Sequence, residues 1–258
     1  MYVGIDIGGT RCRVLVVPTI EITNDRSRHE FVLSHDFDND MAELIRTIKQ
    51  HASAKDIKAV GLSVPGDLNA DKTMFADPSD NLTEWSDKPV KAILEREFQC
   101  PIVMENDGAA AALGEAYFGA GKGKDFCFVI WGTGIGGAQV VCKNGVVTCA
   151  VLDWYRYFDV WEQHCGGNRL QQRFGKPASQ LTEGEWNEVM QDFQKYLGQF
   201  ISDTDARCVV FGGGVAIKQQ ERLLACAKNY SSVDVRISEL GEDAGLYGAL
   251  ALLEPSQQ

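Results

Sequence analysis

Apolar residues alternate with polar ones over short stretches of the chain and recur at helical spacing over others. In the first part of the chain this pattern predicts strands at residues 1–7, 12–19, 30–37, 59–64 and 101–106. It predicts helices at residues 41–52, 88–98 and 108–119. The first two strands should form a hairpin closed by a glycine turn. Strands that alternate with helices in this way indicate an α/β fold.

The order of elements starts again after Lys122. Residues 125–132, 136–145 and 146–151 repeat the succession of strand, glycine turn, strand and strand seen at the N-terminus. Two long helices at about 160–174 and 183–202, a strand at 208–215 and a helix at 242–254 should follow. The repetition indicates two α/β lobes: residues 1–106, completed by the C-terminal helix, and residues 107–241.

Glycine clusters follow three of the predicted strands, at residues 4–10, 131–138 and 211–216. Glycine has no Cβ, so a glycine-rich turn lets backbone N–H groups approach phosphate oxygens closely. One such cluster is a weak signal, but three in one chain favour a nucleotide held from several sides.

Charge and composition exclude several kinds of partner. The 36 acidic and 25 basic side chains give a net charge of −11, which repels nucleic acids and anionic membranes. No apolar run approaches the roughly 20 residues that a membrane span requires, and Met1 leads directly into the first strand, so we expect a cytoplasmic protein. The eight cysteines are scattered and form no paired zinc ligands.

Two acidic positions are candidates for chemistry. Asp6 stands at the end of a strand beside two glycines, where its carboxylate could hold magnesium against phosphates. Taken alone, a capping role in the turn explains it equally well, but the second glycine cluster favours the functional interpretation. Asn106 and Asp107 lie at a strand-to-helix junction, where they could bind a polyol and accept a proton from its hydroxyl. The alternative is an Asx-type helix cap, and we favour the functional interpretation because capping alone does not require both residues.

The chain resembles the ROK family of sugar kinases, which belong to the actin-like ATPase superfamily together with hexokinase. The resemblance rests on segments in the family's order: GIDIGGT at 4–10, AVGLSVPGDLN at 59–69, NLTEW at 81–85, PIVMENDGAAAALGEA at 101–116, WGTGIGGAQVV at 131–141, FGGGVA at 211–216 and AGLYGA at 244–249. It implies two ribonuclease-H-like lobes with a nucleotide and sugar cleft between them.

The resemblance also assigns roles to individual residues. It makes Asp107 the general base, and it places Gly66, Asn106 and Glu162 at the sugar, although composition alone describes Glu162 as an exposed acid at a helix start. The residues that match the two phosphate motifs and the adenosine motif are Asp6, Gly8, Gly9, Thr10, Gly132, Thr133, Gly134, Gly136, Gly137, Gly213 and Gly214. Asp6 is the expected magnesium site.

The chain departs from the family in one segment. The family's GExGH motif, whose Glu and His bind the sugar, is absent, and the best match sets Asp153 against the Glu and Arg156 against the His. The zinc-binding cysteine loop that follows this motif is also missing. We therefore expect no zinc and an altered sugar pocket.

The expected function is ATP-dependent phosphorylation of a hexose or hexose derivative, with Mg²⁺ as cofactor and Asp107 as the base. Two alternatives remain: a sugar kinase that uses polyphosphate, and a catalytically weak regulatory protein that binds sugar or nucleotide. No segment before the first strand could hold a DNA-binding helix-turn-helix, so a DNA-binding regulator is not expected. The family resemblance suggests a homodimer.

Overall fold

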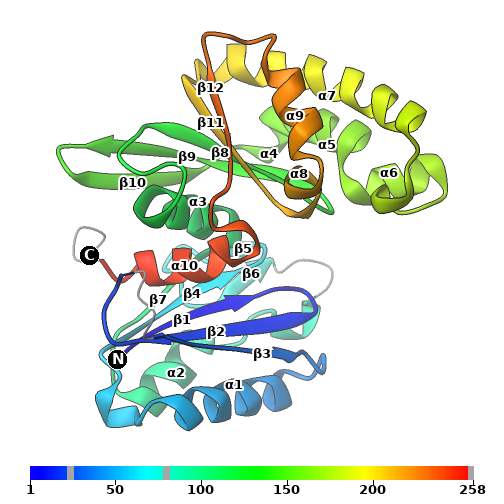
Figure 1. Ribbon diagram of the computed structural model, residues 1–258. Helices are drawn as coiled ribbons and strands as arrows, with labels where there is room; N and C mark the ends of the chain where they lie inside the picture. The colour runs from blue at the N-terminus through cyan, green and yellow to red at the C-terminus, as the bar shows by residue number, and fades with distance from the viewer. Residues whose placement is uncertain (22–25, 78–81, 255–258) are drawn as a thin grey trace. The chain divides into compact units, whose positions relative to one another are not determined.

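The chain forms two compact units in a computed structural model, which describes residues 1–21, 26–77 and 82–254 (Figure 1). Unit 1 comprises Met1–Phe118 and Asp243–Gln258, and unit 2 comprises Gly119–Glu242. The sequence-based boundary after residue 106 is earlier than this division, because the helix at Asp107–Phe118 packs within unit 1 on the C-terminal helix.

Unit 1 is built on a five-stranded sheet with the order β3-β2-β1-β4-β7. Strands β3, β2 and β1 are antiparallel, whereas β1, β4 and β7 are parallel. The strands are β1 (Tyr2–Ile7), β2 (Arg11–Val17), β3 (Ser27–Val32), β4 (Ala59–Val64) and β7 (Ile102–Asn106), with a small separate ribbon of β5 (Asp67–Leu68) and β6 (Phe75–Asp77).

Helices cover both faces of this sheet: α1 (Phe37–His51), α2 (Val90–Phe98), α3 (Asp107–Phe118) and α10 (Ala244–Ala251) (Figure 1). The main core lies beneath α1 and α2, where Val3, Ile5 and Ile7 of β1 meet buried side chains such as Leu44 and Leu94. Asp36 begins α1, since its side chain accepts a hydrogen bond from the backbone N–H of Asn39 at 2.9 Å.

Glycines let α10 lie directly on the opposite face. Gly4 and Gly61 are register partners on β1 and β4, and a Cβ on Gly61 would overlap the carbonyl oxygen of Ala249. A Cβ on Gly4 would lie 2.8 Å from the carbonyl oxygen of Leu246. A Cβ on Gly248 would likewise overlap the carbonyl oxygen of Ala110 in α3. The backbone of α10 therefore contacts the sheet and α3 without side chains between them.

Unit 2 repeats the topology of unit 1. Its sheet has the order β10-β9-β8-β11-β12, antiparallel on one side of β8 and parallel on the other. The strands are β8 (Phe126–Trp131), β9 (Ile135–Lys143), β10 (Val146–Val151), β11 (Cys208–Gly212) and β12 (Asp234–Ile237). The repeated pattern in the sequence thus corresponds to two sheets of the same design.

The helices of unit 2 pack around an aromatic core. They are α4 (Trp154–Tyr157), α5 (Asp159–Cys165), α6 (Gly167–Phe174), α7 (Glu183–Thr204), α8 (Gly214–Lys218) and α9 (Gln220–Ala227). Trp131 of β8 stacks on Phe193 of α7 with ring centroids 4.3 Å apart, and its indole N–H donates to the carbonyl oxygen of Cys165 at 2.7 Å. A capping box of Thr182 and Glu185 starts α7.

Several elements differ from the sequence prediction. The strand expected at 30–37 is β3 at Ser27–Val32, and its last expected residue, Phe37, belongs to α1 because Asp36 caps that helix. The single helix expected at about 160–174 is two helices, α5 and α6, because Gly166 between them has an extended backbone with ψ of 140°. Strand β12 and the short helices α4, α8 and α9 were not predicted, since each is brief and its apolar pattern is weak.

The contact of α10 with the sheet gives a stability prediction. Gly61→Ala should lower the free energy of unfolding by about 3 kcal/mol or more, because the new methyl group overlaps backbone that cannot move alone. Gly184→Ala is the matched control: Gly184 lies in α7 with open space around it, and alanine there should be neutral or stabilising by up to about 1 kcal/mol. Urea unfolding of both variants measures the difference. Equal midpoints would contradict the close contact.

Candidate active site

Polar groups from distant parts of the sequence gather at one edge of the unit 1 sheet. Strands β1, β4 and β7 are parallel, so their carboxyl ends meet at the same edge. Asp6, Ser63 and Asn106 stand at or near these ends, and Gly66 and Asp107 follow directly. Unit 1 therefore brings together four of the predicted site residues, Asp6, Gly66, Asn106 and Asp107.

Each carboxylate oxygen of Asp6 has a partner on a neighbouring strand. The hydroxyl of Ser63 donates to Oδ1 at 2.8 Å, and Nη1 of Arg13 lies 3.4 Å from Oδ2. Burial raises the pKa of Asp6 above its usual range, while the Ser63 hydrogen bond and the Arg13 charge act in the opposite direction. The carboxylate is thus held in place and partly neutralised.

Asn106 caps helix α3 and also anchors the loop after β4. Its Oδ1 accepts from the backbone N–H groups of Gly108 at 2.9 Å and Ala109 at 3.2 Å, and its Nδ2 donates to the carbonyl oxygen of Gly66 at 3.0 Å. Gly66 has a φ of 79°, a conformation that favours glycine. The helix cap that the sequence offered as the alternative explanation is therefore present, and Asn106 provides it.

Asp107 has an unusual electrostatic environment. Burial, and then the charge of Asp6, raise the pKa of Asp107 to about 6, while the backbone N–H of Gly108 donates to its Oδ1 at 2.8 Å. A carboxyl group with such a pKa changes its protonation state close to neutral pH. That property suits a group that accepts and releases a proton.

The first glycine turn, which holds the predicted phosphate residues Gly8, Gly9 and Thr10, closes the hairpin between β1 and β2. The backbone N–H of Gly8 donates to the carbonyl oxygen of Arg11 at 2.9 Å, and the carbonyl oxygen of Thr10 accepts from the N–H of Leu33 at 3.0 Å. The turn follows Asp6 directly, so its backbone lies at the same edge of the sheet.

The second glycine loop, in unit 2, is fixed on every side. The N–H of Gly132 donates to the carbonyl oxygen of Gly134 at 2.9 Å, while the N–H groups of Gly167 and Asn168 donate to the carbonyl oxygens of Gly132 and Thr133. Ile135 at the end of the loop is held through both backbone groups, as its N–H donates to Glu162 and its carbonyl oxygen accepts from Nε1 of Trp154.

Glu162 supports this loop directly. Its Oε2 accepts from the N–H of Ile135 at 2.7 Å, and a Cβ on Gly134 would lie only 2.5 Å from the same oxygen. A Cβ on Gly166 would lie 2.7 Å from Cγ of Glu162. The glycines on both sides therefore make room for the carboxylate, and its expected role in sugar binding stays a prediction.

A pocket of about 350 Å³ joins the second glycine loop to the third glycine cluster within unit 2. Its lining includes Gly132 and Thr133, then Asn168 at the start of α6, and Gly214 and Lys218 of α8. Gly213 precedes Gly214 with a φ of 89°, and a Cβ there would lie 2.6 Å from the carbonyl oxygen of Trp131. The parallel pairing of β8 and β11 places both clusters at one edge of the sheet.

Gly136 and Gly137, also assigned to the second phosphate motif, lie in strand β9. A Cβ on Gly137 would overlap the carbonyl oxygen of Phe128, so close packing on β8 is sufficient to explain this glycine. Space is open around Gly136. A phosphate role for these two residues stays a prediction.

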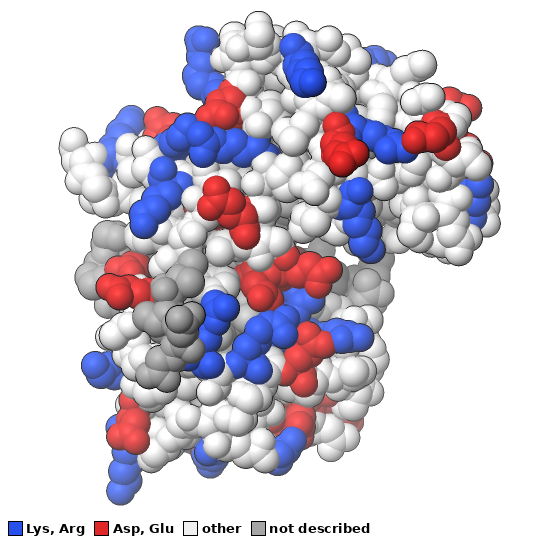
Figure 2. Space-filling view, in the orientation of Figure 1, with Lys and Arg blue, Asp and Glu red and all other residues white. Residues whose placement is uncertain are grey.

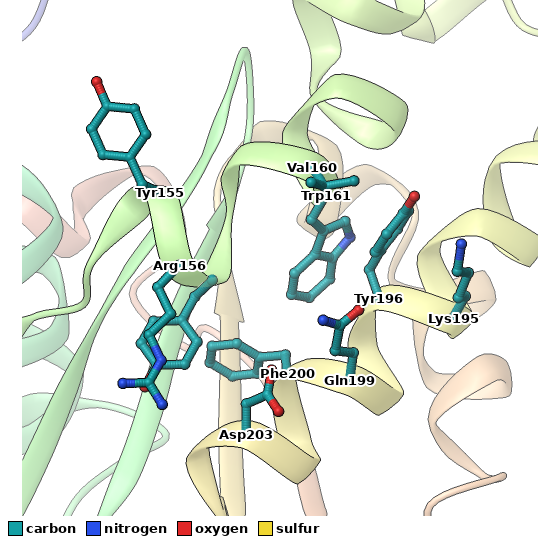
Figure 3. Close-up of a pocket in the computed structure, with 10 residues that line it drawn as sticks. Tyr155, Arg156, Val160, Trp161, Lys195, Tyr196, Gln199, Phe200 and Asp203 are labelled. Atoms are coloured by element: carbon teal, nitrogen blue, oxygen red, sulfur yellow. The ribbon is translucent and has the colours of Figure 1, made fainter.

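The segment in place of the GExGH motif forms the short helix α4. Asp153 caps this helix by accepting from the N–H of Arg156 at 2.9 Å. Arg156 lines a pocket of about 210 Å³ between α4, α5 and α7, where Figure 3 shows it beside Phe200 and Asp203. Tyr155 points away from this group and is 84% exposed. Sugar contacts of Asp153 therefore remain a prediction.

Within the described ranges, no group of three or more His, Cys, Asp or Glu side chains could hold a metal ion. The expected absence of zinc stays a prediction. No helix in the described part of the chain is long and apolar enough to cross a membrane.

Four residues that surround the predicted ones were not expected from the sequence. Ser63 and Arg13 contact Asp6, and Lys218 and Asn168 line the unit 2 pocket. A signal existed for Ser63, which is the one polar residue of the buried strand at 59–64. A signal also existed for Arg13, because a hairpin register counted outward from the glycine turn pairs it with Asp6.

The geometry of two repeated α/β units, one with carboxylates and one with glycine loops at the sheet edge, agrees with comparisons to known proteins. The chain belongs to the ROK family, whose pattern it matches over residues 2–151. It is 31% identical to a glucokinase of Streptomyces coelicolor, across 98% of this chain and 97% of that one.

A glucokinase of Halalkalibacterium halodurans is 32% identical over 55% of this chain, a match that spans only 44% of that enzyme. Among solved structures, a ROK family glucokinase from Streptomyces griseus in complex with glucose and AMPPNP aligns with a TM-score of 0.74 and 22% identity, over 97% of this chain and 98% of that one. The fold is therefore the actin-like ATPase fold of ROK sugar kinases.

The contact of Glu162 with the loop predicts a local effect on backbone dynamics. Glu162→Ala should speed hydrogen exchange of the Ile135 amide by about tenfold or more, because that N–H loses its acceptor. Glu162→Gln is the control, since its amide oxygen can still accept the bond. Exchange measured by NMR tests this. An unchanged Ile135 rate in the alanine variant would show that Glu162 does not hold the loop.

Proposed function

We propose that this protein transfers the terminal phosphoryl group of ATP to a hydroxyl group of a hexose or hexose derivative, with Asp107 as the general base. The observation that carries the proposal is the environment of Asp107, a buried carboxyl whose pKa is raised to about 6 at a sheet edge shared with Asp6. The similarity of this chain to a glucokinase over nearly its whole length supports phosphoryl transfer to a sugar as the reaction class.

In the proposed reaction, Asp107 accepts the proton of the attacking sugar hydroxyl. The hydroxyl oxygen forms a bond to the γ-phosphorus, the bond from that phosphorus to the bridging oxygen breaks, and ADP leaves with the electron pair. Such transfers depend mainly on positioning and charge stabilisation. Asn106 would orient the sugar beside Asp107, since it already fixes both the start of α3 and the Gly66 loop.

Asp6 fits the role of the magnesium ligand. Arg13 approaches its Oδ2 only to the long distance of 3.4 Å, so this oxygen retains capacity for a cation. Magnesium commonly binds one or two carboxylates together with substrate phosphates. When bound, the cation would neutralise charge on the phosphate oxygens.

The unit 2 pocket would hold the nucleoside end of ATP. Its volume of about 350 Å³ falls within the usual range for small-molecule sites. Gly214 borders the pocket and Gly213 directly precedes it in the proposed adenosine motif, and the fixed loop at Gly132 and Thr133 would lie beside the phosphates.

A polyphosphate donor is the main alternative to ATP. A long polyanion requires an extended basic surface. On the face shown in Figure 2, acidic and basic side chains are mixed over the described residues, and the net charge of the chain is −11. These charges favour ATP.

A coupled assay of ADP release across glucose, fructose, mannose, allose and the N-acetylhexosamines tests the proposed function, with polyphosphate as a parallel donor. We expect at least one sugar to be phosphorylated with ATP. Turnover with polyphosphate but not with ATP would show that polyphosphate is the phosphoryl donor. Binding of sugar or nucleotide without turnover would instead support a regulatory protein.

Asp107→Asn should lower kcat by about 100-fold or more and change the sugar KM much less, because the amide cannot accept the proton. Asp38→Asn is the matched control, since Asp38 is exposed in the first turn of α1. Steady-state kinetics and circular dichroism of both variants measure the effect. A near wild-type rate for Asp107→Asn would show that Asp107 is not the general base.

The raised pKa of Asp107 predicts a pH dependence. The base must be ionised to accept a proton, so kcat/KM should fall about tenfold per unit as the pH drops below about 6 and level off above it. An ordinary aspartate would keep its activity down to about pH 4. A pH profile with no acid limb above pH 5 would contradict the buried environment of Asp107.

A further inference from the structure

One row of polar residues crosses the whole unit 1 sheet. The strand registers pair Glu30 with Arg13, Arg13 with Asp6, Asp6 with Ser63 and Ser63 with Glu105. Register partners on adjacent strands point to the same face of a sheet. Asp6 is therefore the centre of a five-residue row that includes every strand of this sheet.

Hydrogen bonds and ion pairs connect the central members. Ser63 donates to one oxygen of Asp6 at 2.8 Å, and Arg13 lies 3.4 Å from the other oxygen. Arg13 in turn is 3.5 Å from Glu30, which also pairs with Arg11. The side chains of Arg13 and Asp6 are only 22% and 16% exposed, so water screens their interaction less than at the surface.

Helix α10 closes over the centre of the row. A Cβ on Gly245 would lie 2.6 Å from Oδ1 of Asp6 and 3.0 Å from Oγ of Ser63. Only glycine at position 245 leaves Oδ1 of Asp6 and Oγ of Ser63 in their present positions. The Asp6 carboxylate is thus fixed from two strands and from the helix above it.

We propose that Arg13 and Ser63 are positioning residues that hold the Asp6 carboxylate in its working orientation, one at each oxygen. The assignment rests on the proposed kinase function, in which Asp6 serves the phosphates. Arg13 and Ser63 act through Asp6 and do not touch the sugar. A competing explanation is that the row only stabilises the sheet.

Two variants and one control test the assignment. Arg13→Gln and Ser63→Ala should each lower kcat about tenfold and leave the sugar KM within about twofold. Both substitutions displace the Asp6 carboxylate, which serves phosphoryl transfer and not sugar binding. Arg11→Gln is the matched control, because Arg11 lies on the same strand and pairs with Glu30 rather than with Asp6. It should keep the wild-type kcat.

A double-mutant cycle separates positioning from sheet stability. In an Asp6→Asn background, Arg13→Gln should lower kcat by no more than about twofold further, because its effect operates through the missing carboxylate. A residue that only stabilises the sheet would lower the melting temperature and retain its effect on kcat in both backgrounds.

Calorimetry supplies a measurement that is independent of turnover. Binding of ADP is measured with and without Mg²⁺. Arg13→Gln should reduce the Mg²⁺-dependent gain in affinity about threefold or more and leave the Mg²⁺-free affinity unchanged, and Arg11→Gln should alter neither.

The outcomes distinguish this assignment from the proposed function. Wild-type protein that phosphorylates no sugar would overturn the proposed function and, with it, the assignment. Active wild type with Arg13→Gln indistinguishable from Arg11→Gln in kcat and in calorimetry would overturn the assignment alone. Equal effects of Arg13→Gln in the wild-type and Asp6→Asn backgrounds would also overturn it.

Discussion

The close approach of α10 to strands β1 and β4 is the contact on which the arrangement of unit 1 depends. Gly4 and Gly61 remove the side chains that would separate the helix from the sheet, and Gly245 brings the start of the helix onto Asp6. Burial by this contact contributes to the raised pKa of Asp6, whose charge in turn raises the pKa of Asp107. Because α10 follows the whole of unit 2 in sequence, unit 1 is complete only when the chain returns to it.

The two units use one sheet design for different purposes. In unit 1 the carboxyl ends of the parallel strands carry Asp6, Asn106 and Asp107, which suit proton transfer and cation binding. In unit 2 the same edge carries two glycine clusters, and Glu162 and Trp154 hold the backbone at the end of the first of them, at Ile135. The two units therefore have similar sheet edges, and in the proposed function unit 1 supplies the carboxylates and the first phosphate turn, whereas unit 2 supplies the second glycine loop and the nucleoside pocket.

Much of this architecture could be predicted from the sequence because the strands are short, apolar and bounded by glycine. The repeated order of strands after Lys122 indicated the second unit, and the Asn106–Asp107 junction was recognised from its apolar and small-residue flanks. The split between α5 and α6 was not predicted, since it depends on the extended backbone of Gly166, which periodicity does not report. The Arg13 contact of Asp6 could have been found by counting the hairpin register from the glycine turn, whereas the contact of Glu162 with the loop depends on tertiary packing, which a single sequence does not contain.

A crystal structure with AMPPNP, Mg²⁺ and the best sugar substrate is the most direct test of the proposed mechanism. We expect the nucleoside in the pocket bordered by Gly132, Gly214 and Lys218, the metal near Asp6, and a sugar hydroxyl hydrogen-bonded to Asp107. We also expect Ser63 to donate to Asp6 in the complex. A sugar bound away from Asp107, or a metal held without Asp6, would contradict the account.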